Sequence, residues 1–538
     1  MPADRRPIAA AALLALPLLL AQHAARLPLG FPLELPVVLL LLAGAPAVLR
    51  APLRLGVTAV LAVLLALALL DLATAAALNR RFNPLLDLPL VADAWRLASG
   101  SLGVPLALAA AAAAAGGLGL AAASLWWAAG RLPARPRPAL LALAVPFVAL
   151  AALDAAPGPR AFDPPGTAAA SRLALMHVGD GWRARGDLAR FRAEAAADAW
   201  AAAPADAILP ALKGRDVFLM FVESYGRSAL ANPLYAPGVT AVLAEAEVRL
   251  AAAGLAARSA WLVSPVVGGQ SWLARATLVS GLAVDNEGRY RALLASPRRT
   301  LPHLAQAGGW RTAAVVPAIT LPWPEAAWFG YDTVLAAKDL GYAGLPFNWV
   351  TMPDQFTLAS FERRLLDPAP RPPVFAEIAL ISSHAPWTPI PPILPWEALG
   401  DGRVFDRFAT AGEPPEVVWR DADRVREQYR RSLDYTLRVV GGFAERRAAT
   451  RPLVVVVGDH QPAPLVSGDP EGREVPVHLI GPPGLLAGFA DWSPGLLPSA
   501  DAPVLPMQAF RDRLLAGFAA PQPRQAALGR PLPPPDGH

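Results

Sequence analysis

The stretch Leu453-Val-Val-Val-Val-Gly-Asp459-His460 is an apolar run that ends in an acid and a histidine. Five apolar residues followed by a glycine are typical of a buried strand in a parallel sheet. Open α/β sheets carry their chemistry at the carboxyl ends of such strands, so Asp459 and His460 are candidate functional residues. A carboxylate beside an imidazole is also a common pair of ligands for a divalent metal. The pair alone fits a solvated turn equally well, so other residues must decide.

Short apolar runs alternate with helical stretches throughout residues 216–519. This alternation predicts an α/β sheet with helices on both faces. We expect strands at residues 217–222, 312–316, 374–381, 453–457 and 475–480.

The first part of the chain has a different composition. The chain has 538 residues and is 54% apolar, which is too long for one core and too apolar for an ordinary soluble protein. The excess lies in nearly uncharged runs of Leu, Ala and Val, with the length of about 20 residues that crosses a bilayer. We expect five membrane spans, at about residues 8–27, 33–49, 55–78, 104–129 and 139–153.

Arginines beside these runs predict their orientation, because positive charge favours the cytoplasmic side. With the N-terminus inside, the cytoplasmic flanks hold Arg5, Arg6, Arg50, Arg54, Arg131, Arg135 and Arg137. The outer loops then hold Arg26, Arg80, Arg81 and Arg96. Five spans place everything after Ala156 outside a bacterial-type cytoplasmic membrane, on the periplasmic side. We therefore expect a transmembrane domain over residues 1–156, a juxtamembrane connector over 157–213, an α/β domain over 214–520 and a disordered tail over 521–538.

The charge and cysteine content narrow the possible functions. The chain has no cysteine, so neither a disulfide nor a thiol nucleophile is available. Its net charge of +5 is carried almost wholly by arginine, and no basic stripe alternates with aromatic residues. Nucleic acid is therefore not expected as a partner.

Two further segments offer groups for chemistry. Glu223 follows the apolar run 217–222, and Val267-Gly-Gly-Gln270-Ser271 leads from a glycine pair into an expected helix. Serine is a preferred helix cap, which is the structural alternative for Ser271. The same position would expose its hydroxyl in the positive field of a helix N-terminus, where anions bind.

A histidine ends another expected strand. The chain has only seven histidines, and two of them, His384 and His460, follow apolar runs. A single histidine is more often structural than catalytic. Together, however, a carboxylate, a hydroxyl, a histidine and an Asp-His pair are the groups needed for metal-assisted displacement at phosphorus or sulfur.

In this order, Glu223-Ser, Gly-Gln-Ser271, Ser383-His384-Ala-Pro and Gly458-Asp459-His460-Gln resemble the motifs of the sulfatase and alkaline-phosphatase-like superfamily. They look most like its membrane-anchored branch, which includes lipoteichoic acid synthases and phosphoethanolamine transferases. The resemblance covers residues 217–480, and the expected five-span anchor is similar to the layout of lipoteichoic acid synthases. It implies a sulfatase-like catalytic domain over residues 214–520.

The resemblance also implies roles for individual residues. Glu223, Asp459, His460 and Ser271 would hold one divalent metal, with Ser271 as nucleophile in place of the usual threonine. His384 would bind phosphate or assist the leaving group. Mn, Zn, Mg or Ca could serve, and Mn or Zn is favoured by this ligand set. The reaction would transfer or hydrolyse a phospho-headgroup of phosphoglycerol or phosphoethanolamine type, from a membrane lipid or envelope glycan, through a phosphoseryl intermediate.

Two departures from the family pattern bear on the substrate. Sulfatases carry a proline two residues after the nucleophile, but Ser271-Trp-Leu-Ala-Arg275 has Leu273 there, so hydrolysis of a sulfuric ester is the alternative reaction. Lipoteichoic acid synthases have Trp-Asn-Arg where this chain has Trp323-Pro-Glu325. A carboxylate repels phosphate, so Glu325 would favour a donor other than simple glycerophosphate, such as one with an amine headgroup; a surface glutamate without such a role is the alternative.

The remaining expectations concern substrate contacts and support of the metal site. Substrate-binding roles are expected for Arg227, Arg275, Trp323 and Glu325, and a role behind the metal ligands for His478. A protein of another class, a non-catalytic domain that binds a headgroup, stays open as an alternative.

Overall fold

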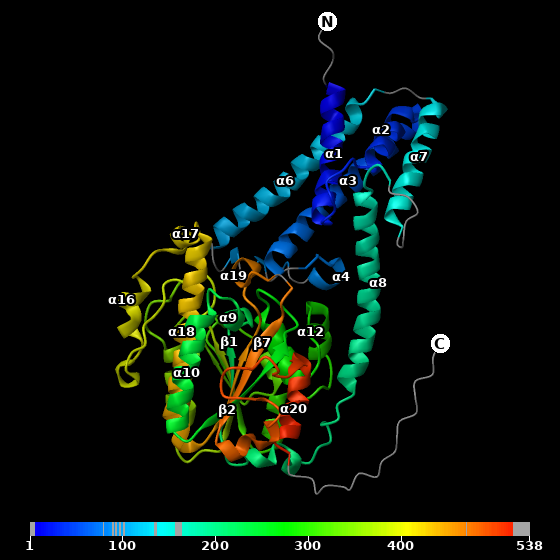
Figure 1. Cartoon of the computed structure of the whole chain (residues 1–538). Helices are drawn as coiled ribbons and strands as arrows, with labels where there is room; N and C mark the ends of the chain where they lie inside the picture. The colour runs from blue at the N-terminus through cyan, green and yellow to red at the C-terminus, as the bar shows by residue number, and fades with distance from the viewer. Residues whose placement is uncertain are drawn as a thin grey trace, which may run out of the picture. The chain divides into compact units, whose positions relative to one another are not determined.

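The computed structural model describes residues 6–519 except 79, 89–90, 92–93, 96–97, 100–102, 134–136, 157–163 and 470. The expected tail and the flanking residues Arg5, Arg96 and Arg135 lie outside the described residues. The chain divides into two compact units, coloured along the chain in Figure 1. Unit 1 comprises Met1–Ala193 with Asn286–Ala292, and unit 2 comprises Glu194–Asp285 with Leu293–His538. The boundary at residue 193 lies within the segment expected to connect the two domains.

Unit 1 is helical. Its elements are α1 (Arg6–Ala24), α2 (Glu34–Gly44), α3 (Ala47–Leu78), α4 (Pro84–Asp87), α6 (Val104–Arg131), α7 (Pro138–Ala155), most of α8 (Ala169–Ala196) and part of α12 (Glu287–Leu294). Four of these helices, α1, α3, α6 and α7, are long and apolar enough to cross a membrane. This confirms an N-terminal set of apolar helices.

The expected span over residues 33–49 is not one helix. Helix α2 ends at Gly44 after 11 residues, a length of about 16 Å, which is roughly half the bilayer core. Ala45 then adopts an extended backbone with ψ of 136°, the conformation favoured before a proline, and α3 begins at Ala47. Of the five expected spans, four are therefore present as helices of spanning length among the described residues.

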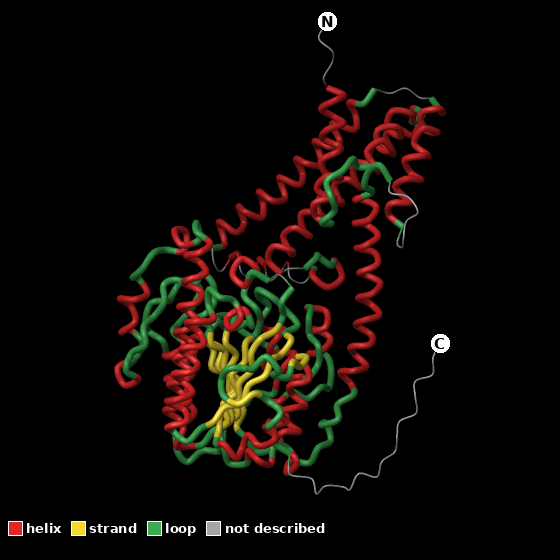
Figure 2. The backbone as a smooth tube through the Cα atoms, in the orientation of Figure 1, coloured by secondary structure: helices red, strands yellow, loops and turns green. Residues whose placement is uncertain are grey.

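Unit 2 contains one mixed sheet, drawn in yellow in Figure 2. Its strands are β1 (Val217–Val222), β2 (Ala256–Val263), β3 (Arg311–Val316), β4 (Thr333–Ala336), β5 (Val374–Leu380), β6 (Leu453–Gly458), β7 (Glu474–Gly481), β8 (Ser493–Pro494) and β9 (Val504–Pro506). The five expected strands are confirmed as β1, β3, β5, β6 and β7. The sheet order is β4-β3-β5-β1-β6-β7-β2-β8, with β9 paired to β2.

Strand β1 lies at the centre of the sheet, between β5 and β6 and parallel to both. Val222 is in register with Leu380 on one side and with Gly458 on the other. The residues that follow these three strands therefore leave the sheet at the same height and at the same edge. This register brings the Glu223, His384 and Asp459 segments together.

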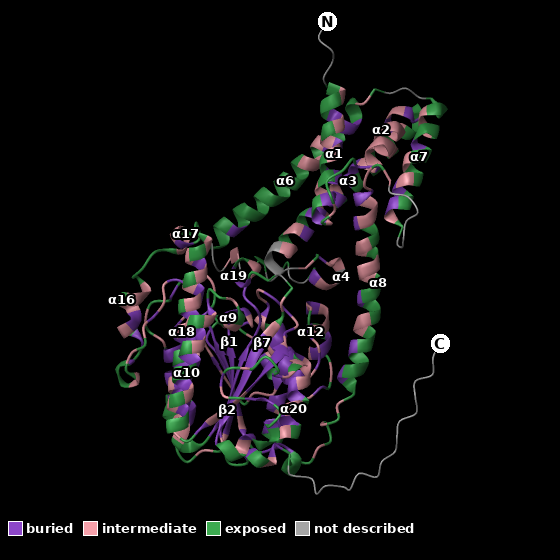
Figure 3. Ribbon diagram, viewed as in Figure 1, coloured by how far each residue is buried: buried purple, intermediate pink, exposed green. Residues whose placement is uncertain are grey.

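Both faces of the sheet are covered, and β1, β5 and β6 are wholly buried, as Figure 3 shows in purple. Phe218, Met220 and Val222 of β1 belong to a core that includes α10 (Ala236–Ala252), α15 (Asp354–Phe361) and α18 (Ala422–Arg447). Alternate side chains point to the other face, where Phe221 lies beneath Arg275 of α11 (Ser271–Ser280). The α/β class predicted from the alternating pattern is therefore confirmed.

Smaller helices complete unit 2. They are α9 (Ser228–Ala231), α13 (Leu301–Ala307), α14 (Ala326–Phe329), α16 (Asp406–Ala409), α17 (Pro415–Val418), α19 (Pro464–Ser467) and α20 (Phe510–Gly517), with several 3-10 turns between them.

Candidate metal and nucleophile site

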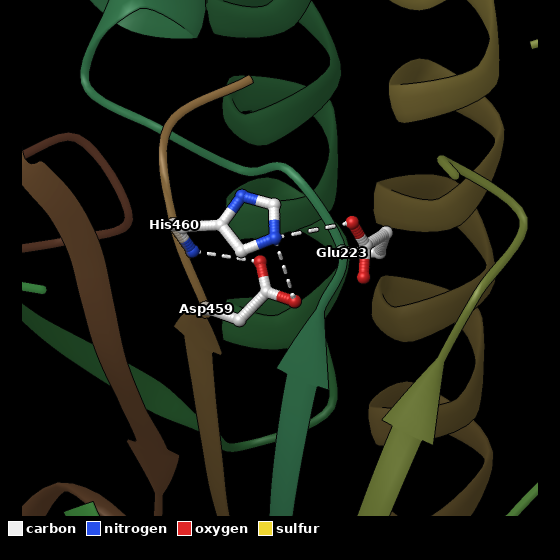
Figure 4. A group of neighbouring side chains, drawn as sticks. All are labelled: Glu223, Asp459 and His460. Atoms are coloured by element: carbon white, nitrogen blue, oxygen red, sulfur yellow. Dashed lines mark hydrogen bonds and ion pairs between the residues drawn. The ribbon is translucent and has the colours of Figure 1, made fainter. Parts of the chain in front are cut away.

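Glu223, Asp459 and His460 form a buried cluster at the carboxyl ends of β1 and β6, as Figure 4 shows. One ligand atom from each lies within 4.8 Å of the others. His460 Nε2 is 3.3 Å from Glu223 Oε1 and 3.8 Å from Asp459 Oδ2. Their exposed fractions are 9%, 2% and 1%, so this is not the solvated strand-end turn that the pair alone allowed.

Hydrogen bonds from backbone amides continue beyond the ends of β1 and β6 and hold Asp459 in place. The amide of Asp459 donates to the Val222 carbonyl over 3.3 Å, and the amides of Ser224 and His460 donate to Asp459 Oδ1 over 2.8 and 2.7 Å. Gly458 is required here because a Cβ on it would lie 1.9 Å from the backbone oxygen of Tyr225. The apolar run therefore ends in glycine because the chain that follows β1 crosses directly over it.

One contact of His460 sets its neutral tautomer. Nδ1 lies 2.9 Å from the backbone oxygen of Gln461, which can only accept, so Nδ1 carries the proton in the assigned tautomer. Nε2 then presents its lone pair to the two carboxylates. A backbone carbonyl in this position is the usual partner of a histidine that ligates metal.

Two members of the cluster, His460 and Asp459, hold a proton more tightly than usual. Burial lowers the pKa of His460, but the negative charges of Asp459 and Glu223 outweigh burial and raise this pKa to about 9. Burial, with the charge of Glu223, raises the pKa of Asp459 to about 7. Burial opposes ionisation of Glu223 too, but the charge and hydrogen bond of His460 keep its pKa below the usual range. At pH 8 the cluster thus carries two carboxylates and one imidazolium, and a divalent cation would replace that proton.

Ser271, at the start of α11, also contacts this cluster. It is the first residue of α11, and Gln270 before it is left-handed, with φ of 63°. The Ser271 hydroxyl donates to Glu223 Oε2 over 3.0 Å and lies 3.2 Å from His460 Nε2. The loop before it is fixed by the amide of Gly268, which donates to the Gln461 carbonyl. Ser271 is therefore a member of the cluster and not the residue that caps α11.

The three buried residues, with the Ser271 hydroxyl beside them, offer the kinds of donor that a divalent ion takes. Metal–ligand bonds of about 2.1 Å in a tetrahedron place neighbouring ligand atoms roughly 3.4 Å apart. His460 Nε2 lies 3.3 Å from Glu223 Oε1, 3.8 Å from Asp459 Oδ2 and 3.2 Å from Ser271 Oγ, and Ser271 Oγ contacts the other Glu223 oxygen over 3.0 Å. Oxygen donors with one imidazole suit Zn or Mn.

His384 lies on the loop after β5, with its side chain exposed. The loop is tied to β1 because the Ser383 hydroxyl donates to the Glu223 carbonyl over 2.6 Å. Behind it, the buried Asp354 carboxylate accepts from the amides of Ile381 and Ser382 over 2.6 and 3.1 Å. Burial is the largest influence on the pKa of Glu223 and raises it. The interactions with His460 lower this pKa, and the charge of His384 lowers it further by a smaller amount. His384 is thus an exposed residue on a loop that is tied to Glu223.

Arg275 lies one helical turn after Ser271, in an ion pair that the sequence did not indicate. Its Nε donates to Glu377 Oε1 over 2.6 Å, and the Tyr331 hydroxyl donates to Glu377 Oε2 over 2.5 Å. The signal for Glu377 was present as a single acid inside the apolar run of β5. The charge of Arg275 is therefore already compensated, and its expected substrate-binding role stays a prediction.

Trp323 and Glu325 are close in sequence but differ in their contacts. The Trp323 ring centre lies 6.0 Å from the Arg275 guanidinium and 6.2 Å from the Tyr331 ring. Glu325 is half-buried and directly precedes α14. Its carboxylate has no hydrogen bond or ion pair within the described part of the chain. Both substrate-binding roles remain predictions.

Arg227 and His478 have partners outside the cluster. The Arg227 guanidinium pairs with the Glu474 carboxylate. His478 lies 2.8 Å from the Ser259 hydroxyl and 3.1 Å from the Tyr225 hydroxyl, and burial lowers its pKa to about 3. His478 is therefore neutral, and its two ring nitrogens contact these two hydroxyls and not the cluster. A supporting role for it remains a prediction.

No family model matches the chain, and no curated protein matches it by sequence. Three solved structures are similar to it in part, each with 14% identity. They are the lipoteichoic acid synthase LtaP from Listeria monocytogenes (58% of this chain, 76% of that chain, TM-score 0.37), the phosphoglycerol transferase GacH from Streptococcus pyogenes with sn-glycerol-1-phosphate (63%, 88%, 0.37) and a protein in the alkaline phosphatase superfamily from Vibrio parahaemolyticus (62%, 74%, 0.35). A likeness of this degree does not reveal chemistry, which has to come from the site residues.

Proposed function

We propose that the chain is a membrane-anchored, metal-dependent enzyme of the sulfatase and alkaline-phosphatase-like superfamily, which transfers or hydrolyses a phospho-headgroup outside the cytoplasmic membrane. One observation carries the proposal. The hydroxyl of Ser271 lies 3.0 Å from Glu223 Oε2 and 3.2 Å from His460 Nε2, at the first residue of a helix. A nucleophile is thus held beside three buried groups that can bind a divalent cation.

The chemistry follows from this arrangement. A divalent ion at the cluster would lower the pKa of the serine hydroxyl and neutralise charge on the phosphoryl group. Glu223 accepts the hydroxyl hydrogen in the present geometry and orients the serine oxygen. The positive end of the α11 helix dipole favours an anion at the same place.

In the first step the Ser271 hydroxyl releases its proton to solvent, its oxygen forms a bond to phosphorus, and the ester bond to the leaving alcohol breaks. His384, which is exposed, donates the proton that the leaving oxygen needs. In the second step an acceptor alcohol or water attacks phosphorus and gives its proton to His384, the bond to Ser271 breaks, and the serine oxygen takes up a proton from solvent. Transfer and hydrolysis therefore differ only in the second nucleophile.

The apolar helices of unit 1 support a lipid-linked substrate. Four helices of spanning length would keep the chain at the membrane, where phospholipid headgroups are concentrated. A membrane lipid as donor and a second lipid or an envelope glycan as acceptor are the substrates we propose.

The test is mass spectrometry of the Ser271 peptide from full-length protein, together with metal analysis. We expect one equivalent of Mn or Zn and a phosphorus-containing adduct on Ser271 after incubation with membrane phospholipids. Ser271→Ala should lower headgroup release by roughly 10³-fold or more. Ser280→Ala, which changes a buried serine at the other end of the same helix, is the matched control.

Other outcomes would contradict the proposal in identifiable ways. Release that survives Ser271→Ala would exclude this serine as nucleophile. Loss of two hydrogens from Ser271 would indicate formylglycine and hence sulfuric ester hydrolysis. Tight metal and headgroup binding without any turnover would indicate a binding protein.

A further inference from the structure

A buried carboxylate lies behind the loop that carries His384. Asp354 is the first residue of α15 and is fully buried. Its Oδ1 accepts from the amides of Ile381 and Ser382 over 2.6 and 3.1 Å, and its Oδ2 accepts from the Thr436 hydroxyl over 2.8 Å. The Asp354 amide donates in return to the Ser382 hydroxyl over 2.9 Å. All these partners are neutral, and Asp354 forms no ion pair within the described part of the chain.

The stability of unit 2 does not account for this charge. A carboxylate buried without a cation costs free energy, and hydrogen bonds from neutral groups offset only part of it. Burial raises the pKa of Asp354 and the hydrogen bonds lower it, and the result is a pKa of about 6. Because its usual value is 3.8, the folded state loses stability as the pH rises through this range. A neutral residue would avoid that loss, so the carboxylate needs another explanation.

The hydrogen bonds of Asp354 hold the turn between β5 and His384. The His384 amide donates to the Ile381 carbonyl over 3.0 Å, which closes the turn. Within the turn, the Ser383 hydroxyl donates to the Glu223 carbonyl over 2.6 Å. The turn is therefore held by Asp354 at its first two residues and by Glu223 at its third. Its position relative to the metal and nucleophile site is fixed before the chain reaches His384.

The imidazole of His384 depends on this turn for its position. It has one hydrogen bond within the described chain, because Nδ1 lies 2.5 Å from the Ala385 carbonyl. That oxygen can only accept, so Nδ1 carries the proton in the assigned neutral tautomer and Nε2 is left for a substrate. A proton donor must come within about 2.6–3.2 Å of the leaving oxygen. A shift of about 1 Å in such a group can lower a rate about a hundredfold.

We propose that Asp354 is a positioning residue, which fixes the turn at Ile381 and Ser382 and thereby places the imidazole of His384 at the leaving oxygen. The inference rests on the proposed function, because it requires that His384 protonates the leaving group. It predicts a loss of rate that depends on the leaving group. An alkoxide needs a proton in order to leave, whereas p-nitrophenolate leaves without one.

The test compares two substrates of the full chain in lipid nanodiscs. One is phosphatidylethanolamine or phosphatidylglycerol, whichever the wild type turns over, and the other is the p-nitrophenyl ester of the same phospho-headgroup. The measured quantity is kcat/KM, which reports the first step, because both substrates form the same phosphoseryl intermediate.

Asp354→Ala should lower kcat/KM for the lipid about a hundredfold, and for the nitrophenyl ester less than about threefold. The metal content should stay the same. Asp354→Asn should keep most of both activities, because its side-chain oxygen can still accept from the amides of Ile381 and Ser382.

Two threonine variants provide a second test and its control. Thr436→Val removes the partner of Asp354 Oδ2 and should lower kcat/KM for the lipid alone, by about fivefold. This variant decides the question if Asp354→Ala fails to fold. Thr357→Val, the matched control, removes a buried hydroxyl of α15 that bonds to the Pro353 carbonyl and not to the turn. It should leave both activities unchanged.

Combination with His384→Ala separates positioning from a general loss of structure. Once His384 is replaced, Asp354→Ala should have no further effect on the lipid reaction. An equal loss with both substrates, or losses that multiply in the double variant, would overturn the proposal and leave the proposed function intact. A wild type that turns over neither substrate would instead overturn the proposed function, and this role with it.

Discussion

Arg275 Nε donates a hydrogen bond of 2.6 Å to Glu377 Oε1, and this ion pair joins helix α11 to strand β5. Both side chains are largely buried, with exposed fractions of 16% and 2%. The helix that carries Ser271 is thereby fixed to the strand that leads to His384.

Removing one partner of this pair should destabilise unit 2. We expect Glu377→Gln to cost about 3 kcal/mol, because it leaves the Arg275 charge buried and uncompensated. Replacing both residues, as Arg275→Met with Glu377→Leu, should recover most of the loss. Thermal unfolding of the full chain in detergent measures this. Glu245→Gln, which breaks an exposed ion pair with Arg438, is the control and should change little. Equal losses of stability in Glu377→Gln and in Glu245→Gln would contradict the prediction.

Metal affinity should rise with pH. Without metal, the pKa of His460 is raised to about 9 and that of Asp459 to about 7, and a cation needs both groups deprotonated. Between pH 7 and pH 9 one proton is displaced, so affinity should rise about tenfold per pH unit. Below pH 7 two protons are displaced, and the rise should be about a hundredfold per unit. Zn competition with a chelator at pH 6, 7 and 8 measures this. A flat profile would mean that these groups are not the ligands.

Gly458→Ala should remove metal binding without unfolding the sheet. Its Cβ would lie 1.9 Å from the backbone oxygen of Tyr225, so β1 or β6 must shift and the Glu223–Asp459 contact opens. We expect loss of bound metal by elemental analysis, with circular dichroism close to that of the wild type. Gly484→Ala is the matched control, because its Cβ would meet no atom within 4 Å. A variant that keeps its metal would show that the crossing over Gly458 is not required.

His478 should make unit 2 sensitive to acid. Burial lowers its pKa from 6.5 to about 3, so the folded state binds fewer protons than the unfolded state between these values. The stability that neutral His478 gives to the folded state is therefore complete above pH 6.5 and is lost as the pH falls toward 3. In His478→Gln the unfolding temperature should fall less between pH 6.5 and pH 5 than in the wild type. The idea fails if both proteins lose the same number of degrees.

Glu325 should influence the choice of donor. We expect Glu325→Arg to increase turnover of a phosphoglycerol donor relative to a phosphoethanolamine donor, because a cation replaces an anion near the transferred group. Parallel assays with the two lipids measure this ratio. Glu397→Arg, a charge reversal at an exposed surface position, is the control. An unchanged ratio would place Glu325 away from the substrate.

The sequence predicted the parts of unit 2 that depend on local pattern. Apolar runs, continuous in β1 and β6 and broken by one acid in β5, identified these strands, and the register of β1 and β6 explains why Glu223 and Asp459 meet. Strand β2 was missed because Arg258 and Ser259 interrupt its apolar run, although both are accommodated through tertiary contacts with Trp492, Gly495 and His478. Pairings of this kind join residues far apart in the chain and leave no local signal.

The same limit applies to the membrane unit and to the site. A hydropathy pattern does not distinguish one helix over residues 33–49 from a short helix, a proline break and the start of the next. Strand ends and a helix start indicated Glu223, Asp459, His460 and Ser271 one by one, and the resemblance to the superfamily implied that they form one site. The Arg275–Glu377 pair was not, because an arginine close to a nucleophile can bind a substrate or a buried acid, and only the fold decides.

The hydrogen bond from Ser224 to Asp459 spans 235 residues of sequence. The proposed metal site therefore cannot form until β6 has been synthesised and paired with β1, late in the production of the chain. An ion that binds there would be taken up where the completed domain folds. Ligands of this type bind several divalent ions, so the supply in that compartment, more than the ligand set, would decide which metal the protein carries. In the orientation expected here, that compartment lies outside the cytoplasm.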